Sequence, residues 1–237
     1  MNLNNRKDIV FLVLAGFFIT NAIVAELIAG KLFELGPFVL SLGILLWPIV
    51  FLTTDLVNEY YGKDGVKKLT YITVGLISYM FIVITIGIYI KPTSYSPVSE
   101  ENYNKVFGPS QWIIVGSILA FVSSQLVDVF IFWLIRNKTG SKMIWFRATG
   151  STLVSQLIDT FVVQYIGFVL PGAWTMDQFW HNASYTYVFK LLVAIALTPL
   201  IYVAHHYIHK YIGEKESHDQ IQSVAEETLH HKVVDPE

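Results

Sequence analysis

Six long apolar runs constrain this 237-residue chain more than any other feature of its sequence. Each run is close to the roughly 20 apolar residues that a helix needs to cross a bilayer. Only helices and closed barrels satisfy their backbone hydrogen bonds in lipid, and runs this continuous lack the alternation of barrel strands. The sequence therefore predicts an all-α integral membrane protein, a bundle of six transmembrane helices that span residues 9–29, 38–57, 69–90, 112–135, 145–170 and 185–207.

The composition of the chain supports this class. Hydrophobic residues make up 54% of the sequence, charged residues make up 14%, and the mean hydropathy is +0.51. These values are typical of membrane proteins. A formal net charge of −2 gives no electrostatic indication of a nucleic-acid partner. The absence of cysteine excludes disulfides, thiolate nucleophiles and cysteine metal ligands.

The basic residues predict the orientation of the chain. Of the sixteen Lys and Arg residues, only Lys31, Lys91 and Lys105 fall on the side opposite the N-terminus, and Lys190 lies inside the sixth run. Cytoplasmic loops carry an excess of Lys and Arg, so both ends of the chain are expected to be cytoplasmic. The first run lacks a cleavage site and is expected to be a retained helix rather than a signal peptide.

One transmembrane domain is expected over residues 1–211, because no linker divides this part of the chain. Residues 212–237 are polar and are predicted to form a largely disordered cytoplasmic tail. The outer segment 91–111 either lies across a vestibule or forms a surface loop.

Two near-identical pentads place carboxylates inside these apolar runs. Residues 124–128 read Ser-Gln-Leu-Val-Asp, and residues 155–159 read Ser-Gln-Leu-Ile-Asp. An aspartate at the middle of a bilayer costs about 2.5–3.5 kcal/mol, so it usually faces a cavity or a partner. Helical spacing gathers the polar residues of each run into one stripe. The stripes comprise Ser117, Phe121, Ser124, Gln125 and Asp128 in the fourth run, and Thr152, Ser155, Gln156 and Asp159 in the fifth.

The two stripes are expected to meet. The fourth and fifth runs are antiparallel, and a rise of about 1.5 Å per residue places both aspartates about 12–18 Å from the cytoplasmic ends. Serine and glutamine often only hold helices together, for roughly 0.6 kcal/mol each. That role explains two buried aspartates poorly, so Asp128 and Asp159 are predicted to bind substrate. For Gln125 and Gln156 both interpretations stay open.

Other polar residues inside the runs are weaker candidates. Trp47 is expected at mid-span, just before a kink at Pro48, where it either packs or stacks on a ligand. Lys190 either extends to the outer surface or pairs with an aspartate. A gate or secondary polar site, or alternatively a set of interfacial caps, is predicted at Asp55, Asn58 and Glu59.

The six spans and the pentads, together with a stretch that closes the second span, resemble the queuosine-precursor transporter family, which is sometimes grouped with vitamin-uptake transporters. That stretch reads Asp55-x-x-Asn58-Glu59-x-Tyr61-Gly62. The resemblance covers roughly residues 10–210. It implies import of a 7-deazaguanine base such as preQ0 or preQ1 across the bacterial cytoplasmic membrane, for queuosine modification of tRNA. It leaves open which of preQ0, preQ1 and queuine is carried, and whether transport is coupled to protons.

The chemistry of such a base suits the polar stripes. A carboxylate accepts two hydrogen bonds from the N1–H and 2-amino donors, and a glutamine amide donates to O6. Stacking of a base on an aromatic side chain is worth about 1–3 kcal/mol. Asp128 or Asp159 is therefore expected to bind the donor edge, with Gln125 or Gln156 beside it. If one aspartate binds the base, Asp159 is favoured because it lies nearer the middle of its span. The candidate stacking residues are Trp47, Phe121, Phe130 and Phe161.

Two other functions are compatible with parts of the sequence. A membrane subunit of an ATP-driven vitamin importer would dock its partner through Ala22, Ala25 and Ala29, with the ATPase on a separate chain because no Walker motif occurs. An intramembrane enzyme is disfavoured, since neither Gly-x-Ser-x-Gly nor His-Glu-x-x-His occurs. The histidines at the end of the sixth run are expected at the interface rather than as metal ligands, and no cofactor is implied. Whether copies of the chain form a homo-oligomer is left open.

Overall fold

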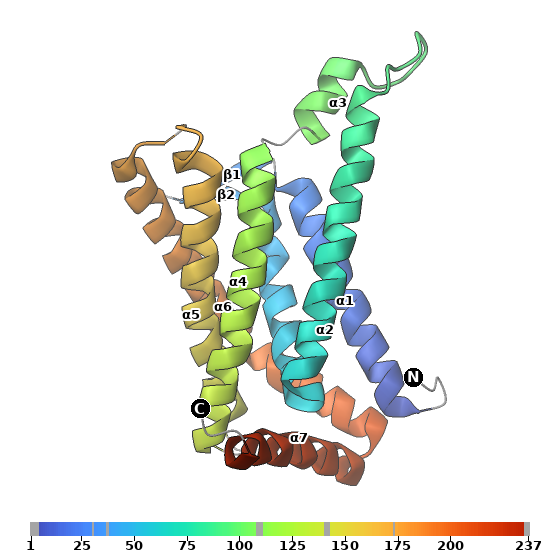
Figure 1. The fold of residues 1–237 in the computed structure, drawn as a ribbon, viewed down its shortest axis with the longest axis vertical. Coiled ribbons are helices and arrows are strands. Elements are labelled where there is room, and N and C mark those ends of the chain that lie inside the picture. The colour runs from blue at the N-terminus through green and yellow to red at the C-terminus, as the bar shows by residue number, and fades with distance from the viewer. Residues whose placement is uncertain are drawn as a thin grey trace.

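The computed structural model describes residues 5–29, 31–36, 38–107, 111–139, 143–172 and 174–234. These residues form an elongated helical bundle with one short β-hairpin (Figure 1). In chain order the elements are α1 (Arg6–Ile28), β1 (Leu32–Leu35), β2 (Phe38–Ser41), the 3-10 helix η1 (Leu42–Leu45), α2 (Trp47–Tyr89), α3 (Glu100–Phe107), α4 (Gln111–Thr139), α5 (Ile144–Gln164), the π-helix η2 (Tyr165–Val169), α6 (Met176–Ile212) and α7 (Glu214–Val234).

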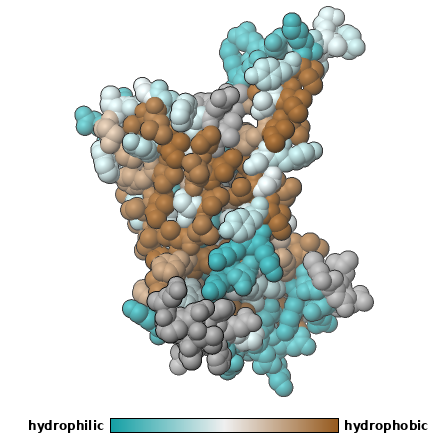
Figure 2. Space-filling model, in the orientation of Figure 1, coloured by the Kyte–Doolittle hydropathy of each residue, from teal (hydrophilic) through white to brown (hydrophobic). Residues whose placement is uncertain are grey.

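Several helices have the length and composition of membrane spans. Within the described residues, four helical segments are long and apolar enough to cross a bilayer, and α6 makes a fifth if its two bent halves are counted together. The halves of α6 meet at 41°, on either side of residue 198. Pro199 follows directly, and proline bends a helix because its ring clashes with the preceding turn. Figure 2 shows apolar side chains over the middle of the visible face and polar ones toward both ends.

Helix α2 reverses direction at Gly62. Its 43 residues comprise two helical arms, because Gly62 has φ 68° and ψ −176°, values outside the helical region. Figure 1 shows one arm of α2 running toward α7 and the other arm turning back toward α3. A residue with a Cβ rarely adopts this backbone conformation, so glycine makes the reversal possible.

Gly62→Ala is expected to lower the free energy of unfolding by about 1–3 kcal/mol, the usual cost of a strained backbone conformation. A Cβ at this position would also lie 3.1 Å from Val224 Cγ1 of α7. The matched control is Gly75→Ala in the same helix, where a Cβ meets nothing within 4 Å and alanine is the better helix former. Denaturant titration of the purified protein in detergent measures both variants. Equal midpoints for Gly62→Ala and wild type would show that the reversal does not depend on this backbone conformation.

The predicted start of the second span at Phe38 is wrong. Residues 38–41 instead form β2, which pairs antiparallel with β1 across a turn that holds Gly36 at φ 58°. After η1, helix α2 begins at Trp47, so this tryptophan lies at a helix start and not at mid-span. The kink expected at Pro48 is absent for the same reason. In the first turn of a helix the missing proline N–H has no helical partner to lose.

Helix α6 begins at Met176, nine residues before the predicted start of the sixth span. The apolar run shows only the part of the helix that lies in lipid. The additional turns are fixed by a capping box, in which the Thr175 side chain accepts from the Gln178 N–H and the Gln178 side chain accepts from the Thr175 N–H.

The prediction of a largely disordered tail is wrong for residues 214–234, which form α7. This helix lies across one end of the bundle (Figure 1). Ser217 and Ile221, which are four residues apart on one face, are buried. Gln220 Nε2 donates a hydrogen bond to the Tyr60 carbonyl at 2.9 Å. These contacts with α2 order a polar segment whose composition alone indicates disorder.

Candidate functional site

The two pentads meet at the interface between α4 and α5, as predicted. Ser155 Oγ donates a hydrogen bond to Asp128 Oδ1 at 2.9 Å. Asp128 is fully buried, and within the described residues its Oδ2 atom has no hydrogen-bond partner. Asp128 is not among the residues that line the cavities described below. The side chain therefore contributes to the contact between the two helices.

A cavity of about 510 Å³ opens between the hairpin end of α1, the first turn of α2, and helices α3 to α6. Its walls are mostly apolar, with a few polar side chains among them. The polar residues include Glu26, Ser117, Asp159, Gln164, Thr186 and Lys190, and the aromatic residues include Trp47 and Trp174. We call it the outer cavity. Its size and lining are typical of small-molecule sites, which measure about 300–1,000 Å³.

An ion pair joins α5 to α6 on the wall of the outer cavity. Lys190 Nζ lies 2.6 Å from Asp159 Oδ2, and both side chains are about one-tenth exposed. Lys190 therefore pairs with an aspartate and does not extend to the outer surface, the alternative that the sequence favoured. Within the described residues, no hydrogen bond reaches Asp159 Oδ1, so this oxygen can accept hydrogen bonds from a ligand.

A second cavity of about 40 Å³ lies among α2, α5 and α6, and we call it the inner cavity. Trp47 and Lys190 line both cavities. Gln156 and Asp55 line the inner cavity, and among the described residues Gln156 Nε2 and Asp55 Oδ1 are buried without a hydrogen-bond partner. Buried polar atoms without a protein partner usually bind water or a ligand. The inner cavity, which shares Trp47 and Lys190 with the outer one, is therefore a polar site with unused hydrogen-bonding capacity.

Gln125 and Phe121 are not among the residues that line these cavities. Gln125 Nε2 donates to Thr54 Oγ1 at 3.2 Å and links α4 to α2. The Phe121 ring lies between Phe18 and Trp47, with centroids 6.1 and 5.5 Å away. Both residues pack helices together, and Phe121 supports one face of the Trp47 side chain.

The other two aromatic candidates also lie away from the cavities. Phe130 is 55% exposed and stacks on Trp133 along the outside of α4. The Phe161 ring contacts Phe179 and Trp180 of α6, each with centroids 5.6 Å apart. Neither ring is among those that line the outer or inner cavity.

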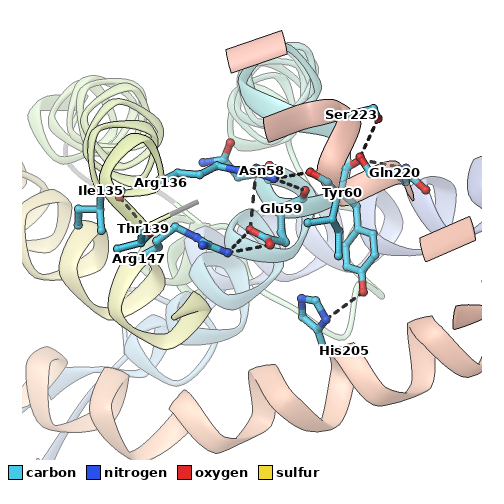
Figure 3. A network of polar contacts seen from close by, with 11 residues as sticks. Asn58, Glu59, Tyr60, Ile135, Arg136, Thr139, Arg147, His205, Gln220 and Ser223 are labelled. Atoms are coloured by element: carbon cyan, nitrogen blue, oxygen red, sulfur yellow. Dashed lines mark hydrogen bonds and ion pairs between the residues drawn. The ribbon is translucent and has the colours of Figure 1, made fainter. Parts of the chain in front are cut away.

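A buried ion network lies between the pentads and α7 (Figure 3). Arg147 Nη2 of α5 lies 2.7 and 2.8 Å from the two carboxylate oxygens of Glu59, and both residues are almost fully buried. Arg136 of α4 donates to the carbonyls of Asn58, Glu59 and Ile221 at 3.1, 3.3 and 3.0 Å. The network therefore ties α2, α4, α5 and α7 together below the cavities. Asn58 and Glu59 are buried, so an interfacial cap does not describe them.

Sequence reasoning missed the burial of both arginines and the position of Glu26. The positive-inside rule uses Arg136 and Arg147 only to assign the cytoplasmic side. It counts basic residues near the ends of the spans and does not predict whether their side chains are buried. Glu26 lines the outer cavity, where Ser117 donates a hydrogen bond to it. The available signal was the same as for the aspartates, a carboxylate within an apolar helix.

The histidines near the end of α6 form a chain of contacts with α2. Tyr60 Oη and His205 Nδ1 are 3.1 Å apart, and His209 Nε2 lies 3.0 Å from the same His205 nitrogen. Across the described part of the chain, no group of three His, Asp or Glu side chains is placed to hold a metal ion.

A bundle of apolar helices around a cavity with a few polar side chains in its wall is an arrangement that membrane transport proteins use. Residues 41–204 match the family described as putative vitamin uptake transporter, and the chain belongs to this family. It is therefore a multi-pass membrane transport protein and not an enzyme.

Two relatives carry a more specific name. The chain is 32% identical over 181 residues to a probable queuosine precursor transporter of Bacillus subtilis (strain 168), which covers 76% of this chain and 78% of the relative. It is 26% identical over 156 residues to a probable queuosine precursor transporter of Haemophilus influenzae (strain ATCC 51907 / DSM 11121 / KW20 / Rd), over 65% of this chain and 63% of the relative. No solved structure matches the chain.

Proposed function

We propose that this chain imports a queuosine precursor, a 7-deazaguanine base such as preQ0 or preQ1, across the bacterial cytoplasmic membrane. Membership of the family and the names of two relatives support this substrate class. The structural observation that carries the proposal is that Asp159 lines the outer cavity and Gln156 lines the inner cavity, while Trp47 and Lys190 line both.

The proposed site matches the base group by group. Lys190 holds Asp159 Oδ2, which orients the carboxylate and leaves Oδ1 for the N1–H and 2-amino donors. Gln156 lies three residues before Asp159 on α5 and shares its face, so its unpartnered Nε2 can donate to O6. Trp47 supplies an aromatic surface for the ring.

Asp128 has a supporting role in this proposal. Its carboxylate accepts a hydrogen bond from Ser155, one residue before Gln156, and so fixes the rotation of α5 against α4. Asp55 lines the inner cavity and is close enough to interact electrostatically with Asp128, Glu59 and Arg147. We therefore assign Asp55 and the Glu59–Arg147 pair to the closed inner end of the path.

The proposed topology has six spans with both ends cytoplasmic. The 43 residues of α2 would measure about 65 Å as one helix, roughly twice the hydrocarbon core, so its two arms cross separately. The start of α1 and the end of α6 lie at the same end of the bundle, because Arg6 Nη1 donates to the Tyr211 carbonyl at 3.1 Å. With this end in the cytoplasm, the outer cavity faces the outside.

The structure does not favour the alternative of a subunit of an ATP-driven importer. Of Ala22, Ala25 and Ala29, the small residues expected to dock a partner, Ala22 and Ala25 are fully buried within the chain and Ala29 is partly buried. Gly43 of η1 packs so closely on α1 that a Cβ there would lie 2.6 Å from the Ala25 carbonyl oxygen. Ala25 of α1 and Ala29 at its C-cap are therefore packed against the chain's own η1 segment.

The proposed function can be tested in a bacterium that neither makes queuosine precursors nor imports them. Expression of this chain should restore queuosine in tRNA when preQ0 or preQ1 is supplied at low concentration, and the empty vector should not. The host should also lack the ATPase modules of vitamin importers, so that restoration excludes a requirement for them. Absence of queuosine while the chain is present in the membrane would contradict the proposal.

A further inference from the structure

Glu26 of α1 faces the outer cavity, and the base-binding chemistry described above does not use it. Ser117 Oγ donates a hydrogen bond to Glu26 Oε1. The described residues provide no hydrogen bond to Oε2, although Glu26 lines the cavity wall. Glu26 is also close enough to Asp159 and Lys190 to interact electrostatically with both. One oxygen of this carboxylate is therefore fixed by the protein and the other is available to a ligand.

The charges on the cavity wall do not balance. Lys190 is paired with Asp159 at 2.6 Å. Lys105, at the exposed mouth, is paired with Glu101 of the same helix α3. Each described lysine of the lining thus has its own carboxylate, and among the described residues Glu26 forms no ion pair. A charge in a poorly solvated cavity is strongly stabilised by an opposite charge, so this wall favours a ligand that brings one.

Glu26 and Asp159 are on different walls of the outer cavity, an arrangement that suits the two ends of the base. The two carboxylates stand on different walls, since Glu26 is on α1 and Asp159 is on α5. In a 7-deazaguanine the N1 and 2-amino edge and the substituent at C7 are at opposite ends of the ring system. A base whose donor edge is bound by Asp159 therefore directs its 7-substituent toward another wall of the cavity.

We propose that Glu26 is a specificity-determining residue that binds a cationic 7-substituent, so that the chain prefers an aminomethyl base such as preQ1 to a nitrile base such as preQ0. This inference rests on the proposed function. An alkylamine, like the lysine side chain with its pKa near 10, is protonated at neutral pH and donates charge-assisted hydrogen bonds to a carboxylate. A nitrile is uncharged, accepts hydrogen bonds only, and gains nothing from Glu26.

Competition for uptake of a labelled 7-deazaguanine by vesicles containing the purified chain tests this inference. The wild type should be inhibited by the aminomethyl base at a concentration at least tenfold below that of the nitrile base. Glu26→Gln should weaken inhibition by the aminomethyl base about tenfold or more and leave the nitrile base within about twofold. Glu26→Asp, which keeps the charge, should retain the preference. The matched control is Glu34→Gln, an exposed carboxylate outside the cavity, which should change neither value.

The failures of the two proposals are distinguishable. A wild type that takes up the label but binds the nitrile base as well as the aminomethyl base, or better, overturns the role of Glu26 without any variant. An equal effect of Glu26→Gln on both bases, or no effect, overturns it as well. A wild type that takes up neither base overturns the proposed function and this inference together.

Discussion

Replacement of Arg147 by methionine is expected to lower the free energy of unfolding by about 3–5 kcal/mol. Arg147 has no exposed surface, and Glu59, whose carboxylate it binds at 2.7 and 2.8 Å, is 1% exposed. Without the guanidinium, the Glu59 carboxylate would remain buried with the more distant Arg136, at 3.9 Å, as its nearest cation. Denaturant titration of the purified protein in detergent measures the change.

Two further variants separate the buried pair from other effects of the mutation. Lys105→Met breaks the exposed Lys105–Glu101 pair and is expected to cost less than about 1 kcal/mol. The double variant Glu59→Gln with Arg147→Met removes both charges, so it should recover part of the lost stability. If Arg147→Met unfolds within about 1 kcal/mol of wild type, the network does not hold the inner end of the bundle together.

Asp159→Asn is expected to reduce uptake of the base about a hundredfold at limiting concentration. The change removes the charge that accepts the donor edge and leaves Lys190 without its ion-pair partner. Loss of one partner from a buried charged hydrogen bond costs about 2–5 kcal/mol, and a hundredfold change corresponds to about 2.7 kcal/mol. Initial rates of uptake of labelled preQ1 by cells that express each variant at equal levels provide the measurement.

Asp177→Asn is the matched control, because this aspartate is exposed in the first turn of α6, away from the cavities. It should leave the uptake rate unchanged. An unfolding curve for each variant distinguishes a damaged site from a damaged fold. If Asp159→Asn and Asp128→Asn both transport at the wild-type rate, the site lies elsewhere in the chain.

The contact between α4 and α5 could be predicted because it follows from a repeat. Matching stripes on antiparallel runs of similar length predicted that the two pentads meet at similar depth, and Ser155 of one pentad is hydrogen-bonded to Asp128 of the other. The partner of Lys190 could not be chosen in advance. Periodicity shows which residues share a face of a helix, but not how that helix is rotated in the bundle.

The aromatic candidates show a limit that the sequence itself contained. Phe130 and Phe161 each lie two residues after a pentad aspartate, which is about 200° around a helix. They therefore point away from the carboxylates, as residues at this spacing do, and they pack against Trp133 and Phe179. Trp47 lines the cavities for a different reason. Helix α2 begins at Trp47, whereas the sequence predicted this residue in the middle of a span.

Helix boundaries were predicted poorly wherever an apolar run and a helix differ in length. Apolarity shows the part of a helix in lipid, whereas caps and tertiary contacts fix its ends. The two arms of α2 include the polar residues on either side of Gly62, and α7 is ordered by contacts with α2 and Arg136. Caps and tertiary contacts leave no trace in the hydropathy of the sequence, so a prediction from apolar runs does not detect them.

The central claim is that this chain alone moves a 7-deazaguanine base across a membrane. The most direct measurement is uptake of labelled preQ1 by vesicles that contain only the purified chain. The expected result is saturable entry above protein-free vesicles, inhibition by the unlabelled base, and recovery of the base chemically unchanged. Entry no faster than into protein-free vesicles, or recovery of an altered base, would contradict the claim.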